Sequence, residues 1–406
     1  MTKWVVNGLL RKLFNEISRE ELISLIKDLV AIKSRNPPGE EKPCAEYIYS
    51  KFKEWGIEAE MVDKPFPERP QVVAYVRGYG EGENLILNGH MDVVPEGDLR
   101  SWKYPPFEAT VKDDLVFGRG TVDMKSSLAI MMLTMKIFSR YAEKIKGNLI
   151  STFAIGEETG DPGTKYLVTE HLPSKGIRKG VGVVLEPTGL KVATAEGGLV
   201  WYHVFMKGVS THASTPEKGI NAISMAAFAI VEIDKYNKVL SKKKHPLVPS
   251  PTIKVTMIKG GVKENIIPES CWFAIDRRMI PGEKVEDVEA ETRRIIESVS
   301  KYFPKFEYSM KTITIYEPAE IDPTEKIAEI FLKYASEIAG VERKPWGAPY
   351  STDMRNFVND AKWPAIIFGP GDVSKAHRPN ECVSIGEVVT AMKIILATSA
   401  EILGLK

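Results

Sequence analysis

Residues 84–95, NLILNGHMDVVP, join an apolar strand to two titratable side chains at its end. The run of Leu, Ile and Val predicts a strand of a buried sheet, and Pro95 is expected to end it because proline cannot donate a sheet hydrogen bond. Strand alternation places His90 and Asp92 on the same side. The stretch therefore predicts a buried strand that carries a histidine and a carboxylate to its carboxyl end.

Strands and helices alternate around this stretch. Upstream, helices are predicted over residues 20–33 and up to Trp55, and QVVAYVRG at 71–78 is interpreted as the neighbouring strand of the same sheet. The elements predicted downstream are a helix at 128–145, a strand at 148–158, a helix at 163–171 and a strand at 181–187. This alternation predicts an α/β fold with a mostly parallel or mixed central sheet flanked by helices.

A different pattern begins near residue 199. The predicted elements are a strand at 199–208, a helix at 219–236, strands at 252–259 and 271–280, a helix at 283–302 and a strand at 306–315. The β-α-β-β-α-β order predicts a ferredoxin-like (split βαβ) α+β sandwich. Because helices at 323–339 and 384–403 and a strand at 365–371 resume the α/β style, we predict a discontinuous domain of residues 1–197 and 316–406. The sandwich, residues 198–315, is inserted into it.

Composition excludes several classes of partner. The chain has 406 residues, 27% of them charged, and a formal net charge of +1, so no overall field attracts nucleic acid or an anionic membrane. The three cysteines are far apart, which argues against a disulfide framework and predicts a cytoplasmic location. The N-terminal segment is interpreted as one or two amphipathic helices without a cleavage pattern. The apolar segment at 128–138 is too short to span a bilayer.

Ligand-type residues follow each predicted strand of the α/β part. They are His90 and Asp92, then Asp123, then Glu157 and Glu158, then Glu186, and finally His377. Taken singly, each could be an ordinary hydrogen-bonded or solvated residue. Because strand ends gather at one edge of an α/β sheet, their joint occurrence predicts a metal site. Two histidines and three carboxylates could hold two divalent ions if one carboxylate bridges them.

The adjacent pair Glu157 and Glu158 adds a catalytic group to this prediction. Consecutive side chains beyond a strand end point in different directions, so one can bind a metal ion while the other remains free. A free carboxylate beside a metal-activated water can act as a general base, which typically contributes about 10²- to 10⁴-fold in rate. The absence of H-E-x-x-H and G-x-S-x-G motifs disfavours single-zinc proteases and serine hydrolases.

Several motifs extend this pattern over almost the whole chain. In order they are GHMDVVP, GRGTVDMKSS, GEETGDPGTKYL, EPT, GVSTHASTPEKGINAI, GGVKENIIP, DRRMIPG and GPGDVSKAHRPNE. The set resembles the two-zinc metallopeptidase and deacylase family that includes acetylornithine deacetylase, succinyl-diaminopimelate desuccinylase, aminoacylase and glutamate carboxypeptidase. The resemblance implies a catalytic domain that binds two divalent ions, most often Zn with Co or Mn as alternatives, and an inserted domain that serves as lid and dimerisation element.

The resemblance also assigns roles to the metal-site residues. It implies that one zinc is held by His90 and Glu186 and the other by Glu158 and His377, with Asp123 bridging the two. Glu157 would be the general base, and Asp92 would accept a hydrogen bond from the far nitrogen of His90 and so orient the ring. A cis peptide is implied between Asp123 and Met124.

Further roles fall in or near the inserted domain. His212 matches a histidine that reaches across a dimer interface to stabilise the oxyanion. Asn265 and Arg278 match groups that hold the substrate carboxylate, whereas Arg277 is interpreted as a solvated neighbour. Ser351 is a further candidate substrate contact. These roles imply a homodimer.

The predicted function is hydrolysis of an amide in an N-acyl amino acid, releasing the acyl group. The motif GEETGDPGTKYL is similar to the acetylornithine and succinyl-diaminopimelate branch, and Glu at position 186 goes with deacylases and carboxypeptidases within the family. A metallocarboxypeptidase that removes a C-terminal residue from short peptides remains an alternative. A non-catalytic binding protein is disfavoured because the full ligand set and Glu157 are present.

Overall fold

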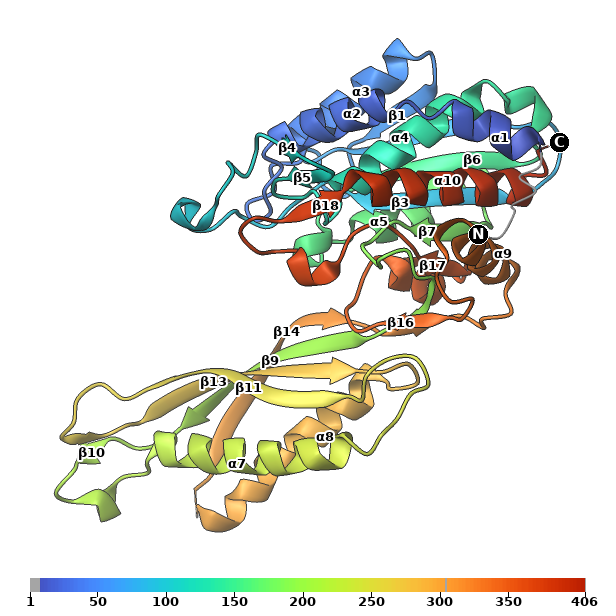
Figure 1. The fold of residues 1–406 in the computed structure, drawn as a ribbon. Coiled ribbons are helices and arrows are strands. Elements are labelled where there is room, and N and C mark those ends of the chain that lie inside the picture. Colours follow the sequence, from blue (N-terminus) through green and yellow to red (C-terminus); the bar gives the residue numbers. More distant parts are fainter. Residues whose placement is uncertain (1–7, 304, 406) are drawn as a thin grey trace. The chain divides into compact units, whose positions relative to one another are not determined.

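The chain folds as two compact units. A computed structural model describes residues 8–303 and 305–405 (Figure 1). The first unit comprises Met1–Thr194, Glu320–Trp346 and Thr352–Lys406, and the second comprises Ala195–Ala319 and Gly347–Ser351. Residues 1–7, where the predicted N-terminal helices begin, lie outside the described residues; the first described helix is α1, Gly8–Asn15.

A mixed sheet forms the centre of the first unit. Nine strands of the described residues take part, in the order β1-β2-β6-β3-β7-β17-β8-β15, with β16 also pairing with β8. Their bounds are β1 Glu58–Val62, β2 Gln71–Arg77, β3 Asn84–His90, β6 Asn148–Ala154, β7 Val181–Val184, β8 Ala193–Glu196, β15 Ala319–Glu320, β16 Trp346–Ala348 and β17 Ala365–Ile367. The central pairs β6–β3, β3–β7 and β7–β17 are parallel, while β1–β2, β2–β6 and β17–β8 are antiparallel.

The prediction that residues 71–78 and 84–94 form neighbouring strands is wrong, because β6 lies between β2 and β3. The connection from β2 to β3 passes over the start of β6 and hydrogen-bonds to it. Gly78 N–H donates to the Gly147 carbonyl at 2.8 Å, and Asn148 N–H donates to the Glu83 carbonyl at 3.0 Å. A Cβ on Gly147 would lie 2.0 Å from the Glu83 carbonyl oxygen, so only glycine allows this approach.

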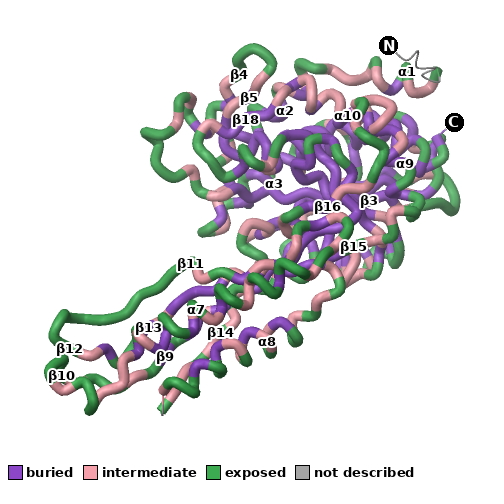
Figure 2. The backbone as a smooth tube through the Cα atoms, turned by 60° about the horizontal axis from the view of Figure 1, so that its bottom comes forward, coloured by how far each residue is buried: buried purple, intermediate pink, exposed green. Residues whose placement is uncertain are grey.

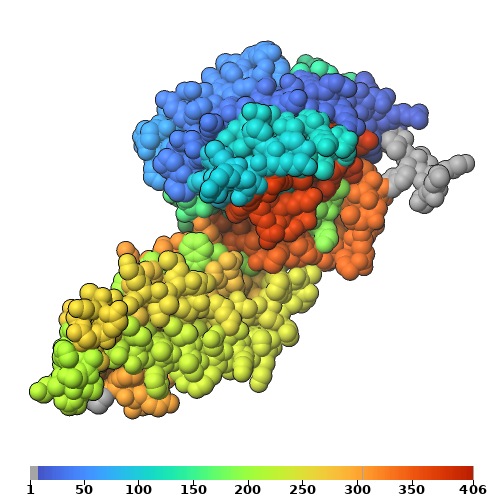
Figure 3. All heavy atoms as spheres, turned by 60° about the vertical axis from the view of Figure 1, so that its left-hand side comes forward, coloured from blue at the N-terminus to red at the C-terminus, as the bar shows by residue number. Residues whose placement is uncertain are grey.

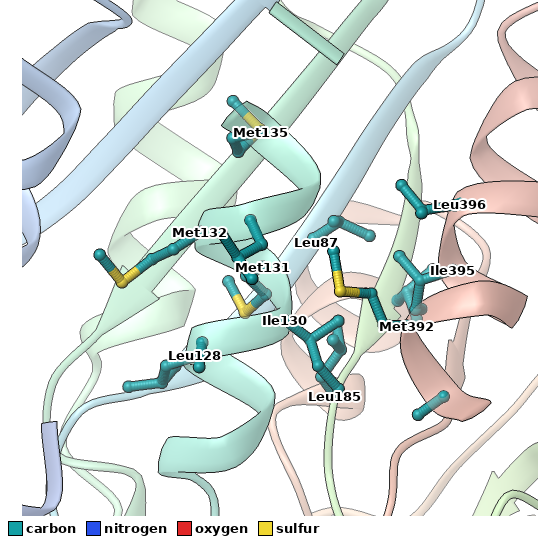
Figure 4. Close-up of a cluster of buried hydrophobic side chains, with 14 of the residues drawn as sticks. Leu87, Leu128, Ile130, Met131, Met132, Met135, Leu185, Met392, Ile395 and Leu396 are labelled. Atoms are coloured by element: carbon teal, nitrogen blue, oxygen red, sulfur yellow. The ribbon is translucent and has the colours of Figure 1, made fainter. Parts of the chain in front are cut away.

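Helices flank this sheet (Figure 1). The main ones are α2 Arg19–Ala31, α3 Lys42–Glu54, α4 Lys125–Ser139, α5 Gly163–Tyr166, α9 Lys326–Tyr334 and α10 Ile385–Ile402. Helix α4 is buried along nearly its whole length because most of its side chains are apolar. Figure 4 shows its side chains beside Leu87 of β3 and Met392 of α10. None of the helices in the described ranges is long and apolar enough to cross a membrane.

The two ends of the described chain meet on the first unit. Helix α1 packs on helix α10, so segments far apart in sequence lie side by side. In the space-filling view of Figure 3, blue and red atoms both belong to this unit. The sheet and its helices therefore form one core from the separate segments of a discontinuous unit. The predicted α/β fold class is confirmed.

The second unit is an open-faced sandwich. Its four-stranded antiparallel sheet has the order β11-β13-β9-β14. The strands are β9 Gly198–Lys207, β11 Thr252–Gly260, β13 Ser270–Met279 and β14 Glu307–Tyr316, and the helices are α7 Ala222–Leu240 and α8 Val285–Glu297. Along β9, Val200, Tyr202 and Val204 are buried under the helices, whereas Trp201 and Phe205 on the other face are exposed. Figure 2 shows the strands and helices of this unit coloured by burial. The element order is the β-α-β-β-α-β order read from the sequence.

Candidate metal centre

Three adjacent parallel strands deliver four ligand-type side chains to one edge of the sheet. His90 is the last residue of β3 and pairs in register with Ala154 at the end of β6. Glu157 and Glu158 follow β6 in a short 3₁₀ turn, Glu157–Thr159, between Gly156 and Gly160. Glu186 lies two residues beyond β7, on the other side of β3. The carboxyl ends of parallel strands thus bring these groups together, as predicted.

Asp123 joins the two predicted halves of the site. Its Oδ1 lies 3.0 Å from His90 Nε2, and its Oδ2 lies 3.2 Å from His377 Nε2. His90 Nε2 is also 3.3 Å from Glu186 Oε1, and His377 Nε2 is 3.0 Å from Glu158 Oε1. Each oxygen of Asp123 therefore faces a different histidine, and each histidine faces a different glutamate.

Two overlapping groups of side chains could each hold a metal ion. They are His90, Asp123 and Glu158, and His90, Glu157 and Glu186, with the potential ligand atoms of each group within 4.8 Å of one another. Imidazole nitrogens and carboxylate oxygens are donors that suit Zn, Co or Mn. The set of residues fits divalent metal ions. Glu157 lies in the second group, so its distance from His90 and Glu186 is compatible with either a ligand or a base.

Burial and mutual contacts strongly perturb the protonation of these groups. Although burial opposes it, hydrogen bonds with His377 and His90 lower the pKa of Asp123. The hydrogen bonds with Asp123 and Glu158 raise the pKa of His377 to about 11. Burial, reinforced by the charge of Asp123, raises the pKa of Glu186 to about 7, and burial raises the pKa of Glu157 well above its usual range. Protons thus occupy positions that a divalent cation would take.

Asp92 contacts both His90 and the glutamate turn. His90 Nδ1 lies 3.0 Å from the backbone carbonyl oxygen of Asp92 and 3.5 Å from Asp92 Oδ1, so the backbone is the nearer acceptor. Asp92 Oδ2 accepts hydrogen bonds from Asn36 Nδ2 at 2.9 Å and from Glu158 N–H at 3.1 Å. Asp92 therefore connects the end of β3 to the turn after β6, a structural role that the sequence did not suggest.

Sequence reasoning missed a buried ion pair that holds the Asp123 loop. Glu381 Oε1 accepts from the backbone N–H groups of Val122 at 2.9 Å and Asp123 at 3.2 Å. Glu381 Oε2 accepts from Arg119 Nη1 at 2.6 Å, and both side chains are almost fully buried. Arg119 and Glu381 belong to the motifs GRGTVDMKSS and GPGDVSKAHRPNE, but nothing in either motif alone reveals the pairing. The predicted cis peptide between Asp123 and Met124 is confirmed.

A further buried carboxylate, Asp353, was also missed. Its Oδ2 accepts from Thr164 Oγ1 at 2.6 Å and its Oδ1 from Asn356 Nδ2 at 2.8 Å. Burial raises the pKa of Asp353, and its negative charge contributes to the raised pKa of Glu157. Sequence reasoning selected Ser351 from the same YSTD motif.

The structure brings His212 and Asn265 together. Thr211–His212 (β10) pairs with Ile266–Ile267 (β12), and Ala213 N–H donates to the Asn265 carbonyl at 3.0 Å. The exposed ring of His212 contacts Ser214 Oγ through Nδ1 at 2.7 Å. These residues belong to the second unit, whereas all the metal-site candidates belong to the first.

Arg278 and Ser351 lie at the other end of the second unit's sheet. Arg278 pairs with Leu199 near the start of β9, and Ser351 Oγ donates to the Gly197 carbonyl at 2.6 Å. At about 3.3 Å per residue, Arg278 is roughly 26 Å along β13 from Ser270, the end near Asn265. Arg278 and Asn265 are therefore not brought together within one chain.

The interpretation of Arg277 as a solvated neighbour is wrong. Its side chain is 1% exposed, and Nη2 donates to Glu283 Oε1 at 2.7 Å, whereas Arg278 is 42% exposed. Strand alternation does place the two arginines on opposite faces of the sheet, as predicted. Odd-numbered residues of β13 face the helices, so Arg277 is the one that is buried. A buried guanidinium is tolerated there because Glu283 neutralises it.

A mixed α/β fold with histidines and carboxylates gathered around one aspartate fits the class of metal-dependent hydrolases. The chain belongs to peptidase family M20/M25/M40, whose family model matches residues 86–401. It is 28% identical over 93% of both chains to N-formyl-4-amino-5-aminomethyl-2-methylpyrimidine deformylase of Halalkalibacterium halodurans. Acetylornithine deacetylase of Klebsiella pneumoniae is 27% identical, with 81% of this chain and 83% of the relative covered.

Solved structures show the same fold. A metallo-carboxypeptidase of this family from Sulfolobus solfataricus matches with a TM-score of 0.76 and 19% identity, covering 93% of this chain and 98% of that one. A dinuclear metal-binding peptidase from Bacillus subtilis matches with a TM-score of 0.70 and 15% identity over 96% and 99%. The predicted family, fold class and enzyme class, a hydrolase of amide bonds, are confirmed.

Proposed function

We propose that this protein is a two-metal amide hydrolase that removes the acyl group from an N-acyl amino acid. The observation that carries the proposal is the position of Asp123, whose two oxygens face His90 and His377 separately. A carboxylate between two imidazoles suits a bridging ligand. One ion would then be held by His90 and Glu186, and the other by Glu158 and His377, with Asp123 shared. Zn is the proposed metal, and the same donors accept Co or Mn.

Glu157 is the proposed general base. Divalent ions, when bound, polarise an amide carbonyl and bring the pKa of a water from about 15.7 towards about 7. Glu157 receives the proton of the attacking water and delivers it to the leaving nitrogen, so one carboxylate serves both halves of the reaction. Its partly buried position, close to His90 and Glu186, would place it beside the attacking water. Asp92 orients the His90 ring, whose Nδ1 lies 3.0 Å from the Asp92 backbone carbonyl oxygen and 3.5 Å from its carboxylate.

Substrate recognition is assigned to the second unit. Arg278 presents a half-exposed guanidinium, which suits bidentate binding of the substrate's free carboxylate. Asp276 already holds one edge of it, accepting from Nε at 2.8 Å and from Nη2 at 3.0 Å. Ser351 lies near the same end of the sheet and is the second proposed contact. A deacylase is favoured over a carboxypeptidase because two relatives that cover most of the chain are named as a deformylase and a deacetylase.

We further propose a homodimer in which His212 and Asn265 act in the partner's site. His212 would donate a hydrogen bond to the developing oxyanion, and Asn265 would contact substrate. Arg278 and Asn265 lie near opposite ends of β13, which supports a division of these roles between two copies. The proposed interface is the edge strand β11 with exposed Met257 and Ile258, together with the exposed Ile223 and Val231 of α7.

The proposed compartment is the cytoplasm, because Cys44, Cys271 and Cys382 are all unpaired in the structure.

A substrate panel tests the proposed reaction. The purified protein, loaded with Zn²⁺ or Co²⁺, is assayed on N-formyl, N-acetyl and N-succinyl amino acids and on short peptides with free or amidated C-termini. Turnover of N-acyl amino acids that is abolished by amidating the substrate carboxylate supports a deacylase with Arg278 as its anchor. Faster cleavage of free peptides would identify a carboxypeptidase. No turnover of any amide by the metal-loaded protein would overturn the proposal.

A further inference from the structure

The turn that carries Glu157 and Glu158 is held at both of its ends. On one side, Asp92 accepts the Glu158 N–H, as described above. On the other, Asp161 N–H donates to the Gly156 carbonyl at 2.8 Å and closes the turn. The Asp161 side chain lies against Gly156, where a Cβ would approach it to 2.3 Å. The position of Asp161 therefore fixes the backbone from which both glutamates project.

Asp161 is in turn held by Arg69. Arg69 Nη1 donates to Asp161 Oδ2 at 2.7 Å, while Nε and Nη2 donate to the two oxygens of Glu41 at 2.9 and 2.5 Å. Glu41 is fully buried and Arg69 is 12% exposed. Arg69 and Glu41 thus form a shielded ion pair, which is destabilising if one partner is removed, whereas the Asp161 side chain is 27% exposed.

A second path connects this cluster to Asp92. Asp161 Oδ2 also accepts from Thr159 Oγ1 at 3.0 Å, and Thr159 Oγ1 accepts from Asn36 Nδ2 at 2.7 Å. Asn36 Nδ2 donates as well to Asp92 Oδ2 at 2.9 Å. The glutamate turn is therefore enclosed by a continuous chain of polar contacts that begins at Arg69 and ends behind His90.

Arg69 is itself fixed by its surroundings. Its guanidinium lies over the Phe66 ring, 5.4 Å from the centroid. Glu41 is the N-cap residue of α3, and Gly39, at φ +103°, leaves space where a Cβ would lie 2.6 Å from Arg69 Nε. One edge of the planar guanidinium, Nε and Nη2, donates to both Glu41 oxygens, while Nη1 donates to Asp161. The compact ammonium group of a lysine cannot reproduce this geometry.

We propose that Arg69 is a positioning residue of the metal centre: through Asp161 it sets the turn that aims Glu157 at the reacting water and Glu158 at its metal ion. This inference rests on the proposed two-metal function, but Arg69 lies outside all the sequence motifs that suggested that function. Groups that orient metal ligands commonly change metal affinity or activity by about 10- to 100-fold when they are replaced. The same range is expected here.

The test compares Arg69→Lys with Arg77→Lys. Arg77 forms the same fork, with Nε and Nη2 at 2.8 and 2.7 Å from the oxygens of Glu58, but this pair is exposed. Arg77 pairs with Asn148 at the start of β6, the end opposite to the glutamate turn. Each full-length protein is titrated with Co²⁺ while the visible spectrum, which reports coordination, is recorded. We expect Arg69→Lys to weaken one of two Co²⁺ equivalents about 10- to 100-fold, to alter the spectrum and to lower kcat with little change in KM. Arg77→Lys should match the wild type.

Two further measurements separate positioning from folding. Asp161→Asn leaves the Arg69–Glu41 pair intact and removes the negative charge that Arg69 Nη1 and Thr159 Oγ1 contact, so it should reproduce the metal and kcat effects even if Arg69→Lys folds poorly. Millimolar guanidinium should partly restore the Co²⁺ spectrum of Arg69→Ala. Normal Co²⁺ spectra and kcat in Arg69→Lys and Asp161→Asn would overturn the inference. A wild-type protein that binds two Co²⁺ without hydrolysing any amide would instead refute the proposed function alone.

Discussion

The two adjacent glutamates make the sharpest prediction for single residues. Glu157→Gln should retain two metal ions per chain and lose about 10²- to 10⁴-fold in kcat, because it removes a base and not a ligand. Glu158→Gln should lose one metal equivalent, since its carboxylate lies against His377 and Asp123. Metal content by mass spectrometry and steady-state kinetics measure both. Loss of one metal ion from Glu157→Gln, with both retained in Glu158→Gln, would show that the roles are reversed.

Metal affinity should depend on the protonation of Glu186. Its pKa is raised to about 7 in the metal-free protein, so below pH 7 the carboxyl group carries a proton that a metal ion must displace. The raised pKa of His377 means that its ring also releases a proton on binding. Apparent Co²⁺ affinity should therefore fall about tenfold or more per pH unit below 7, with proton release detectable by calorimetry in two buffers. Equal affinity at pH 6 and pH 8 would contradict this.

At the scale of elements, Lys125 connects helices α2 and α4. Its fully buried Nζ donates to the carbonyls of Leu29 at 2.9 Å and Ile32 at 2.6 Å, at the C-terminal end of α2. Burial lowers the pKa of Lys125 to about 8, below the value of about 10.4 of an unfolded lysine. Between these two values the unfolded chain binds a proton that the folded chain has released, so Lys125 adds stability as the pH rises from about 8 to about 10.

Urea unfolding of the wild type and of Lys125→Met measures this effect. The variant should be less stable throughout because two helix-end carbonyls lose their donor. The difference in unfolding free energy between the wild type and Lys125→Met should grow by about 1–3 kcal/mol between pH 8 and pH 10. All other titratable groups are the same in the two proteins, so their contributions cancel. A difference that stays constant with pH would mean that Lys125 keeps its proton in the folded state.

The helices and strands that could be predicted from the sequence were those in which apolar residues recur with a clear period. The apolar run of α4 and the alternation along β9 and β13 define helices and strands locally. The order of strands across the sheet is not local, which is why the insertion of β6 between β2 and β3 was missed. The three-residue strands Thr110–Lys112, Leu115–Phe117 and Cys382–Ser384 have too few positions for a pattern, yet they form a sheet of their own.

For the whole molecule, the gathering of the candidate metal ligands could be predicted because parallel strands end at one edge of the sheet. His90, Glu158 and Glu186 follow that rule, so their sequence separation of almost a hundred residues did not matter. The residues that support them follow no such rule. Arg69, Asp353 and Glu381 arrive on loops, and their pairing depends on how those loops pack. A buried ion pair such as Arg119 with Glu381 leaves no periodic trace in the sequence.

The proposed sharing of sites between two copies predicts complementation. His212→Ala chains lack the donor for the partner's site, and Glu157→Ala chains lack the base in their own, so each homodimer should be nearly inactive. A mixed dimer has one site with the wild-type Glu157 of one copy and the wild-type His212 of the other. Mixing equal amounts should restore up to about one quarter of wild-type activity, since half of random dimers are mixed and each regains one of two sites. Subunit exchange is verified by native mass spectrometry. Demonstrated exchange without recovered activity would mean that His212 acts within its own chain or not at all.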